Sequence, residues 1–132
     1  PMKLRIARFN LLGVSLLYVV FGIMFFLDPA KFASGLGYTN ITAEGLIEIR
    51  AIYGGMELAL GFGTLFLLKK NQAIAASYML LITLIGFAGG RLVGIMIDGF
   101  LGNHLWFLIL ELSLTFTIAW SLKQYSKKDA QS

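Results

Sequence analysis

The sequence contains no cysteine, only two prolines among its 132 residues, and charged residues at only 14%. The absence of cysteine excludes a disulfide-stapled secreted fold and any thiol chemistry. A disordered chain is excluded by the 58% of residues that are hydrophobic, and a soluble domain of this length would have too little polar surface to cover itself. Apolar sequence is abundant instead, with a mean hydropathy of +0.78. The composition therefore predicts an integral membrane protein, and we expect a single domain over residues 1–132.

Four apolar runs are each long enough to cross a hydrocarbon core, which needs roughly 20 helical residues. They cover residues 9–27, 46–68, 73–97 and 105–122. Pro29 prevents the first run from continuing, residues 69–72 and 98–103 predict tight turns, and the longer connection over 28–45 is expected along the membrane interface. No small-x-small cleavage site closes the first run, so we expect a helix there rather than a signal peptide. The pattern predicts an all-α, four-helix membrane bundle.

Basic residues are distributed unevenly around these runs. They lie before the first run, after the second and after the fourth, at Lys3, Arg5, Arg8, Lys69, Lys70, Lys123, Lys127 and Lys128. The other two connections carry only Lys31. The positive-inside bias therefore predicts that both termini are cytoplasmic. Although the net charge is +4, short basic clusters beside apolar runs are typical of topology signals, so no nucleic-acid partner is expected.

Polar residues occur in pairs within or at the ends of three of the four apolar runs. The pairs are Arg50 and Glu57, Arg91 and Asp98, and His104 and Glu111. Members of each pair are seven positions apart, close to two helical turns, so we expect each pair to share one helix face. Ionisable groups at bilayer depth usually face a bundle interior or an aqueous cavity. These three polar stripes therefore predict a common polar site.

Depth in the membrane follows from the rise of about 1.5 Å per helical residue. Arg91 and Glu111 each come out about 10 Å from the outer end of their spans, at matching depth. By the same reasoning Arg50 is expected near Asp98 and His104. Glu57 is deepest, and we expect it within reach of Arg91. The polar groups thus share the outer half of the bundle, which predicts a pocket open to the outer face.

The candidate ligand-binding residues of this pocket come from three runs. They are Arg50, Tyr53, Glu57, Arg91, Asp98, His104 and Glu111. The alternative is that the charges form ion pairs that only fix helix register. A metal site is not predicted, because one histidine with scattered carboxylates lacks the close spacing of helical metal motifs. No catalytic residue and no cofactor can be assigned from the sequence.

Small residues form stripes on two of the runs. Gly86, Gly90 and Gly94 recur every four residues on the third, and Gly54, Gly55, Ala59, Gly61 and Gly63 are clustered on the second. Such stripes allow another helix backbone to approach closely. We expect helix packing from both, with the stripe on the third run available for a homo-oligomeric contact.

The segment RAIYGGME at 50–57, together with GRL at 90–92 and DG at 98–99, resembles a bacterial family of small four-helix membrane proteins, domain of unknown function 4345. The similarity extends over nearly the whole chain. It implies a four-helix, multi-pass protein of the bacterial inner (cell) membrane and brings no established activity. In layout the chain is also similar to DoxX and DoxD-type membrane proteins, some of which are associated with quinone or thiosulfate oxidation. That likeness is one of architecture and carries no site.

These observations favour a non-enzymatic membrane protein, a binding or accessory subunit whose outward pocket accepts a lipid-like or quinone-like ligand. In this interpretation Arg50 and Arg91 hold an anionic or carbonyl oxygen. Glu57 and Glu111 orient the two arginines, and Tyr53 lines the wall. One alternative is a membrane oxidoreductase, or a subunit of one, in which Glu57 or Glu111 relays protons to a bound quinone. The others are a purely structural membrane subunit and a small transporter.

Overall fold

The protein is a bundle of four long helices, as seen in a computed structural model that describes residues 2–99 and 102–131. The first is α1 (Met2–Leu27), followed by the short α2 (Pro29–Ser34). The second long helix is continuous but has three parts, which are α3 (Ala43–Ile49), the π-helix η1 (Arg50–Met56) and α4 (Glu57–Lys69). The third and fourth are α5 (Ala73–Asp98) and α6 (Gly102–Asp129).

All four long helices are long and apolar enough to cross a membrane, as expected from the four apolar runs. Each helix extends beyond the limits expected from the apolar runs. Asp28 caps the start of α2, where its carboxylate accepts a hydrogen bond of 3.2 Å from the Lys31 amide. The expected turn between α4 and α5 is present, with Asn71 at φ 58°. Phe100 and Leu101, in the middle of the second expected turn, lie outside the described residues.

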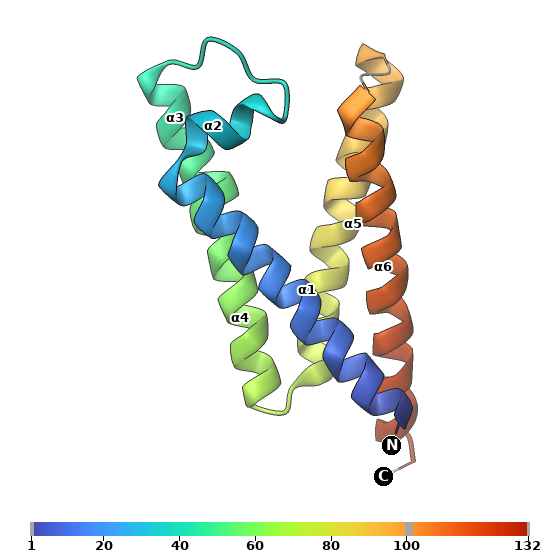
Figure 1. Ribbon diagram of the computed structural model, residues 1–132. Coiled ribbons are helices and arrows are strands. Elements are labelled where there is room, and N and C mark those ends of the chain that lie inside the picture. The colour runs from blue at the N-terminus through green and yellow to red at the C-terminus, as the bar shows by residue number, and fades with distance from the viewer. Residues whose placement is uncertain (1, 100–101, 132) are drawn as a thin grey trace.

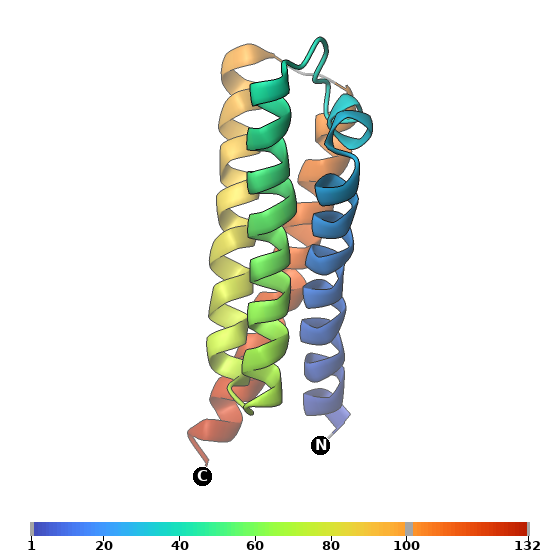
Figure 2. The ribbon, with the colours of Figure 1, turned by 90° about the vertical axis from the view of Figure 1, so that its left-hand side faces the viewer.

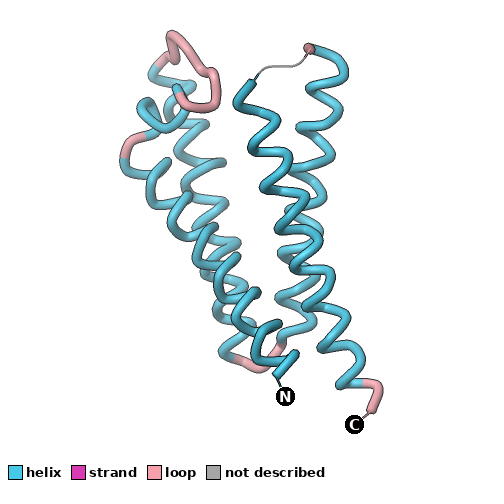
Figure 3. The backbone as a smooth tube through the Cα atoms, turned by 45° about the vertical axis from the view of Figure 1, so that its right-hand side comes forward, coloured by secondary structure: helices cyan, strands magenta, loops and turns pink. Residues whose placement is uncertain are grey.

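The helices form two pairs that are close together at one end of the bundle. Figure 1 shows α5 and α6 side by side, while α1 runs diagonally from the α2 and α3 end toward α6. The two termini and the α4–α5 turn lie at the same end, and α2 and α3 lie at the other (Figures 2 and 3). Asn10 of α1 donates a 3.2 Å hydrogen bond to Ser121 of α6 near the termini. The two ends of the chain therefore lie at the same end of the bundle.

The main apolar core lies nearer the termini. Leu11, Leu68, Leu80 and Ile118 are buried there, one from each long helix. At the opposite end a smaller cluster joins Phe25 to α2 and α3. A gap in the packing is left between these two clusters, and the candidate site occupies it.

Glycine determines how closely α1 approaches the second long helix. A Cβ atom at Gly61 would lie 2.6 Å from Cγ2 of Val19, and one at Gly54 would lie 2.9 Å from the Cα atom of Phe26. The predicted packing role of these two glycines is therefore confirmed. By contrast, a Cβ atom at Gly86, Gly90 or Gly94 would meet nothing within 4 Å among the described residues. The homo-oligomeric contact expected for that stripe stays a prediction.

Candidate functional site

A cavity of about 120 Å³ lies between α1, η1, α4, α5 and α6, toward the α2 end. Most of its wall is apolar, and six aromatic side chains contribute to it, namely Tyr18, Phe21, Phe25, Tyr53, Phe87 and Phe107. Three charged residues also line it, Glu57, Arg91 and Glu111. The cavity thus combines aromatic walls with a small, localised set of polar groups.

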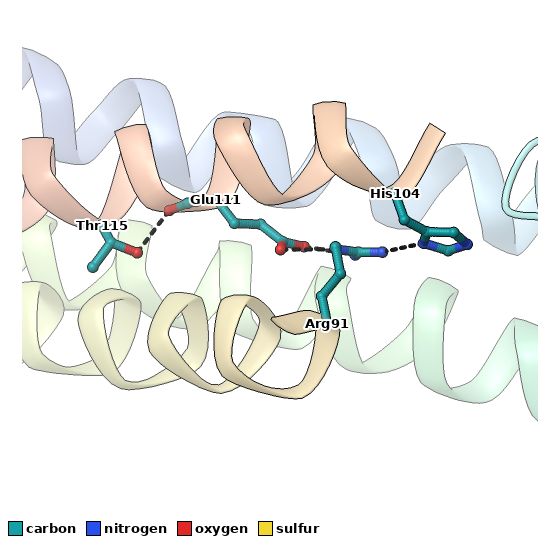
Figure 4. A network of polar contacts seen from close by, with 4 residues as sticks. All are labelled: Arg91, His104, Glu111 and Thr115. Carbon is teal, nitrogen blue, oxygen red and sulfur yellow. Dashed lines mark hydrogen bonds and ion pairs between the residues drawn. The ribbon is translucent and has the colours of Figure 1, made fainter. Parts of the chain in front are cut away.

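Arg91 of α5 is held in place by two residues of α6 (Figure 4). Its Nε donates to Oε2 of Glu111 at 2.9 Å and its Nη2 donates to Oε1 at 2.6 Å, which makes a bidentate ion pair. Its Nη1 donates to Nδ1 of His104 at 2.8 Å, because a guanidinium has no acceptor atom. Phe107 lies against the guanidinium, with the ring centroid 5.2 Å from Cζ. The charged end of Arg91 is therefore fixed by ion pairing and ring stacking together.

Two of the sequence-based expectations are met by this network. Arg91 and Glu111 lie at matching depth, as the bidentate pair requires. His104 and Glu111 share one face of α6, because both contact Arg91. The side chains of Arg91 and Glu111 are only 20% and 12% exposed, so the pair lies in an environment of reduced dielectric constant.

The polar stripe of Arg50 and Glu57 is not arranged as expected. Arg50 donates from Nε to the Phe26 carbonyl at 2.9 Å, and it does not line the cavity that Glu57 faces. The reason is the π-helix over Arg50–Met56, where hydrogen bonds run from i to i+5 and seven residues no longer complete two turns. The expected place of Arg50 beside Asp98 and His104 is therefore corrected, since it is anchored to α1 instead.

Glu57 faces the cavity without an internal partner. Within residues 2–99 and 102–131 it makes no hydrogen bond or ion pair, and the expected contact with Arg91 is not formed. Arg91 is already occupied by Glu111 and His104. The carboxylate of Glu57 is thus available to a molecule in the cavity.

The remaining candidates lie in different places. Tyr53 lines the main cavity and its ring stacks on Phe25, with centroids 5.2 Å apart. Asp98 is exposed and, together with His104 and Arg91, lines a separate cavity of about 170 Å³ near the end of α5. The main cavity therefore brings together Tyr53, Glu57, Arg91 and Glu111 from the predicted set, whereas Arg50, Asp98 and His104 do not line it.

The aromatic wall from α1 was missed by the sequence reasoning. Tyr18, Phe21 and Phe25 all line the cavity, and the Tyr18 hydroxyl shares a 2.9 Å hydrogen bond with Thr83 of α5. Their spacing of three and four residues places them on one helix face, which was the available signal. This face of α1 was not among the predicted site residues, because α1 has no charged residue after Arg8.

The geometry of the site suits an organic molecule better than an ion. Among the described residues, no group of three or more His, Asp or Glu side chains could hold a metal ion. Aromatic walls with a fixed guanidinium and an unpaired carboxylate can instead accept a ring or alkyl group and hydrogen-bond its polar end.

Comparison with known proteins places the chain in a family. No curated protein and no solved structure matches the chain. One family model matches residues 6–122, which is most of the chain, and it agrees with the resemblance found in the sequence. The protein is a small four-helix membrane protein that belongs to the family described as domain of unknown function (DUF4345).

Proposed function

We propose that this protein binds an amphipathic, membrane-resident molecule in the aromatic cavity, as a binding or accessory subunit without catalytic activity of its own. The observation that carries the proposal is that the fixed Arg91 and the unpaired Glu57 face the same largely apolar cavity. Ligand sites typically have this composition, with apolar walls and a few polar groups that orient the ligand.

The two charged groups define the polar end of the ligand. A guanidinium has five N–H donors, of which three are used by Glu111 and His104, so Arg91 retains donors for a carbonyl or phosphate oxygen. Glu57 accepts a hydrogen bond from a hydroxyl or amine group. A lipid headgroup or a quinone-like ring with its hydroxyl groups offers both kinds of atom.

Access from the membrane is supported by the rim between α1 and α6. Leu17 of α1 and Leu110 of α6 line the cavity, yet they are 41% and 43% exposed. In a bilayer an exposed leucine at this depth contacts acyl chains. A ligand dissolved in the bilayer therefore enters sideways between these two helices.

A second candidate function is a membrane oxidoreductase, or a subunit of one, that handles a quinone. It is favoured by the free carboxylate of Glu57 at the cavity wall, since quinone reduction needs a nearby group that supplies or removes protons. A third interpretation, a purely structural role for the ion pair, predicts a cavity without any ligand.

Blocking the rim separates these functions. We expect Leu110→Trp to reduce the amount of bound amphiphile by about tenfold, because the indole occupies the cavity mouth. The measurement is organic extraction of purified protein followed by mass spectrometry. A phospholipid that is present in the wild-type extract and lost in Leu110→Trp favours the binding subunit, and a quinone lost in the same way favours the oxidoreductase.

The matched control is Ile109→Trp, because Ile109 is 45% exposed and adjacent in sequence but does not line the cavity. This variant is expected to retain the wild-type amount. Equal extracts from wild type and both variants would show that the cavity binds nothing and that the polar residues act in packing only.

We also propose that the termini are cytoplasmic and that the membrane is the bacterial inner membrane. Eight of the basic residues named above lie at the end of the bundle that carries both termini, and only Lys31 lies in a connection at the other end.

Reporter fusions test this orientation. Green fluorescent protein at the C-terminus is expected to fluoresce and alkaline phosphatase there to be inactive, since phosphatase needs the periplasm to fold. The same two reporters inserted after Asn40, in the connection between α2 and α3, should give the reverse pattern. An active phosphatase at the C-terminus would show that the termini lie in the periplasm, opposite to the proposed orientation.

A further inference from the structure

A second, larger cavity lies at the end of the bundle that carries the termini. Its volume is about 700 Å³, and it lies between the start of α1, the α4–α5 turn, the start of α5 and the end of α6. The polar residues that line it are Arg5, Arg8, Asn71, Gln72, Tyr125, Lys128 and Asp129. None of them contributes to the aromatic cavity.

The charge of this cavity is predominantly positive. Arg5 and Arg8 of α1 and Lys128 of α6 line it, and Asp129 is the one acidic residue in the lining. Asp129 has an interaction partner of its own within the protein. Guanidinium groups bind phosphate oxygens in a bidentate manner, and an ammonium group adds a point charge. The set of cations therefore matches a phosphate group.

Neutral donors add to the cations. The first residues of α5, from Ala73 to Ala75, line the cavity, and Gln72 makes no side-chain cap for that helix. The first backbone N–H groups of a helix have no partner inside the helix, so they are available to an anion. Asn71 also contributes a side-chain amide to the same wall.

The apolar surroundings favour a lipid over a soluble anion. Leu4 and Ile74 line the cavity beside the cations, and Met2, Ile6 and Phe9 on the same turns of α1 are exposed. Exposed apolar side chains next to basic ones are typical of a helix end at the membrane interface, where acyl chains cover them. The anion present at that depth is the headgroup of a phospholipid.

We infer that the cavity formed by Arg5, Arg8, Lys128 and the start of α5 binds the phosphodiester headgroup of an anionic phospholipid. Basic cavities between membrane helices at the positive side of a protein recognise such headgroups. This site is separate from the proposed ligand cavity, and its lipid belongs to the leaflet on the side of the termini.

The test uses the whole protein, purified in a nonionic detergent and stripped of lipid. Thermal unfolding is measured with added dioleoylphosphatidylglycerol, dioleoylphosphatidylcholine or inorganic phosphate. We expect phosphatidylglycerol to raise the melting temperature with a half-saturating concentration about tenfold lower than that of phosphatidylcholine, and phosphate alone to have no such effect.

Two triple variants with the same change of charge separate a built site from general attraction. The combination Arg5→Gln, Arg8→Gln and Lys128→Gln removes the three cations of the cavity. The combination Lys3→Gln, Lys69→Gln and Lys127→Gln removes three exposed cations at the same end that do not line it. We expect the first to raise the half-saturating concentration of phosphatidylglycerol by about tenfold and the second to leave it within about twofold.

Three results would overturn the inference. Equal weakening by both triple variants would indicate diffuse surface attraction, and stabilisation by phosphate as strong as by phosphatidylglycerol would indicate a soluble anion. Absence of any preference for phosphatidylglycerol over phosphatidylcholine in the wild type would exclude the site even if a variant failed to fold.

Discussion

Replacing Arg91 by leucine is expected to lower the free energy of unfolding by about 3 kcal/mol, because the carboxylate of Glu111 is then left without its partner in a half-buried, low-dielectric position. Replacing Glu111 by leucine should lower the free energy of unfolding by a similar amount, since it removes the ion-pair partner of the Arg91 guanidinium. In the double variant neither charge remains, so the loss should be clearly smaller than the sum of the two single losses. The measurement is unfolding in detergent by heat and by denaturant.

The control for the Arg91 and Glu111 variants is Arg50→Leu. Arg50 makes one hydrogen bond to a backbone carbonyl and no ion pair within the described residues, so its replacement is expected to cost about 1 kcal/mol. Additive losses for Arg91 and Glu111 would mean that the two side chains contribute independently. A loss at Arg50 as large as that at Arg91 would show that the broken ion pair is not the main cause of the destabilisation.

The second large effect is expected at Gly61, where Gly61→Ala should destabilise the protein by about 2 kcal/mol through overpacking. The added Cβ atom would lie 2.6 Å from Cγ2 of Val19 and 2.9 Å from the Ser15 carbonyl oxygen, so α1 must move away from α4. Since Ser15 also accepts a 2.7 Å hydrogen bond from Thr64, this movement would strain a buried polar contact. Melting temperature in detergent measures the change.

Gly13→Ala provides the matched control. A Cβ atom at Gly13 meets nothing within 4 Å among the described residues, and alanine is the better helix former. This variant should therefore raise the stability by about 0.5 kcal/mol, opposite in sign to Gly61→Ala. If both glycine variants shifted the melting temperature in the same direction, the close approach of α1 would not explain the effect of Gly61→Ala.

The sequence could predict most of the fold because each span is long, apolar and bounded by turns or proline. It could also predict the pairing of Arg91 with Glu111 and the shared face of His104 and Glu111, because these residues lie in regular α-helix, where a seven-residue spacing keeps side chains on one face. The contact of His104 with Arg91 was not predicted, since His104 was expected beside Arg50. The same rule failed for Arg50 and Glu57, since the intervening turns are π-helical. No residue type or spacing in that segment indicates a π-helix in place of an α-helix.

The cavity itself was only partly predictable for a related reason. The ionisable side chains indicate Glu57, Arg91 and Glu111, whereas the aromatic residues of α1 carry no charge and resemble those of any apolar span. Their role depends on the diagonal path of α1 across the bundle (Figure 1), along which Gly54 and Gly61 allow close contact with the second long helix.

The π-helix between α3 and α4 accommodates one residue more than ordinary α-helix would hold at the same place. Because a π-helical turn holds one residue more than an α-helical turn, loss of one residue between 50 and 56 would allow the segment to become ordinary α-helix with α3 and α4 in nearly the same register. Ile49 would then stay beside Phe25 and Ala33, whereas side chains within the former π-helix would change direction. A one-residue deletion in this segment is therefore expected to disturb the contacts of Arg50 with Phe26 and of Tyr53 with Phe25 more than the packing of α3 against α2.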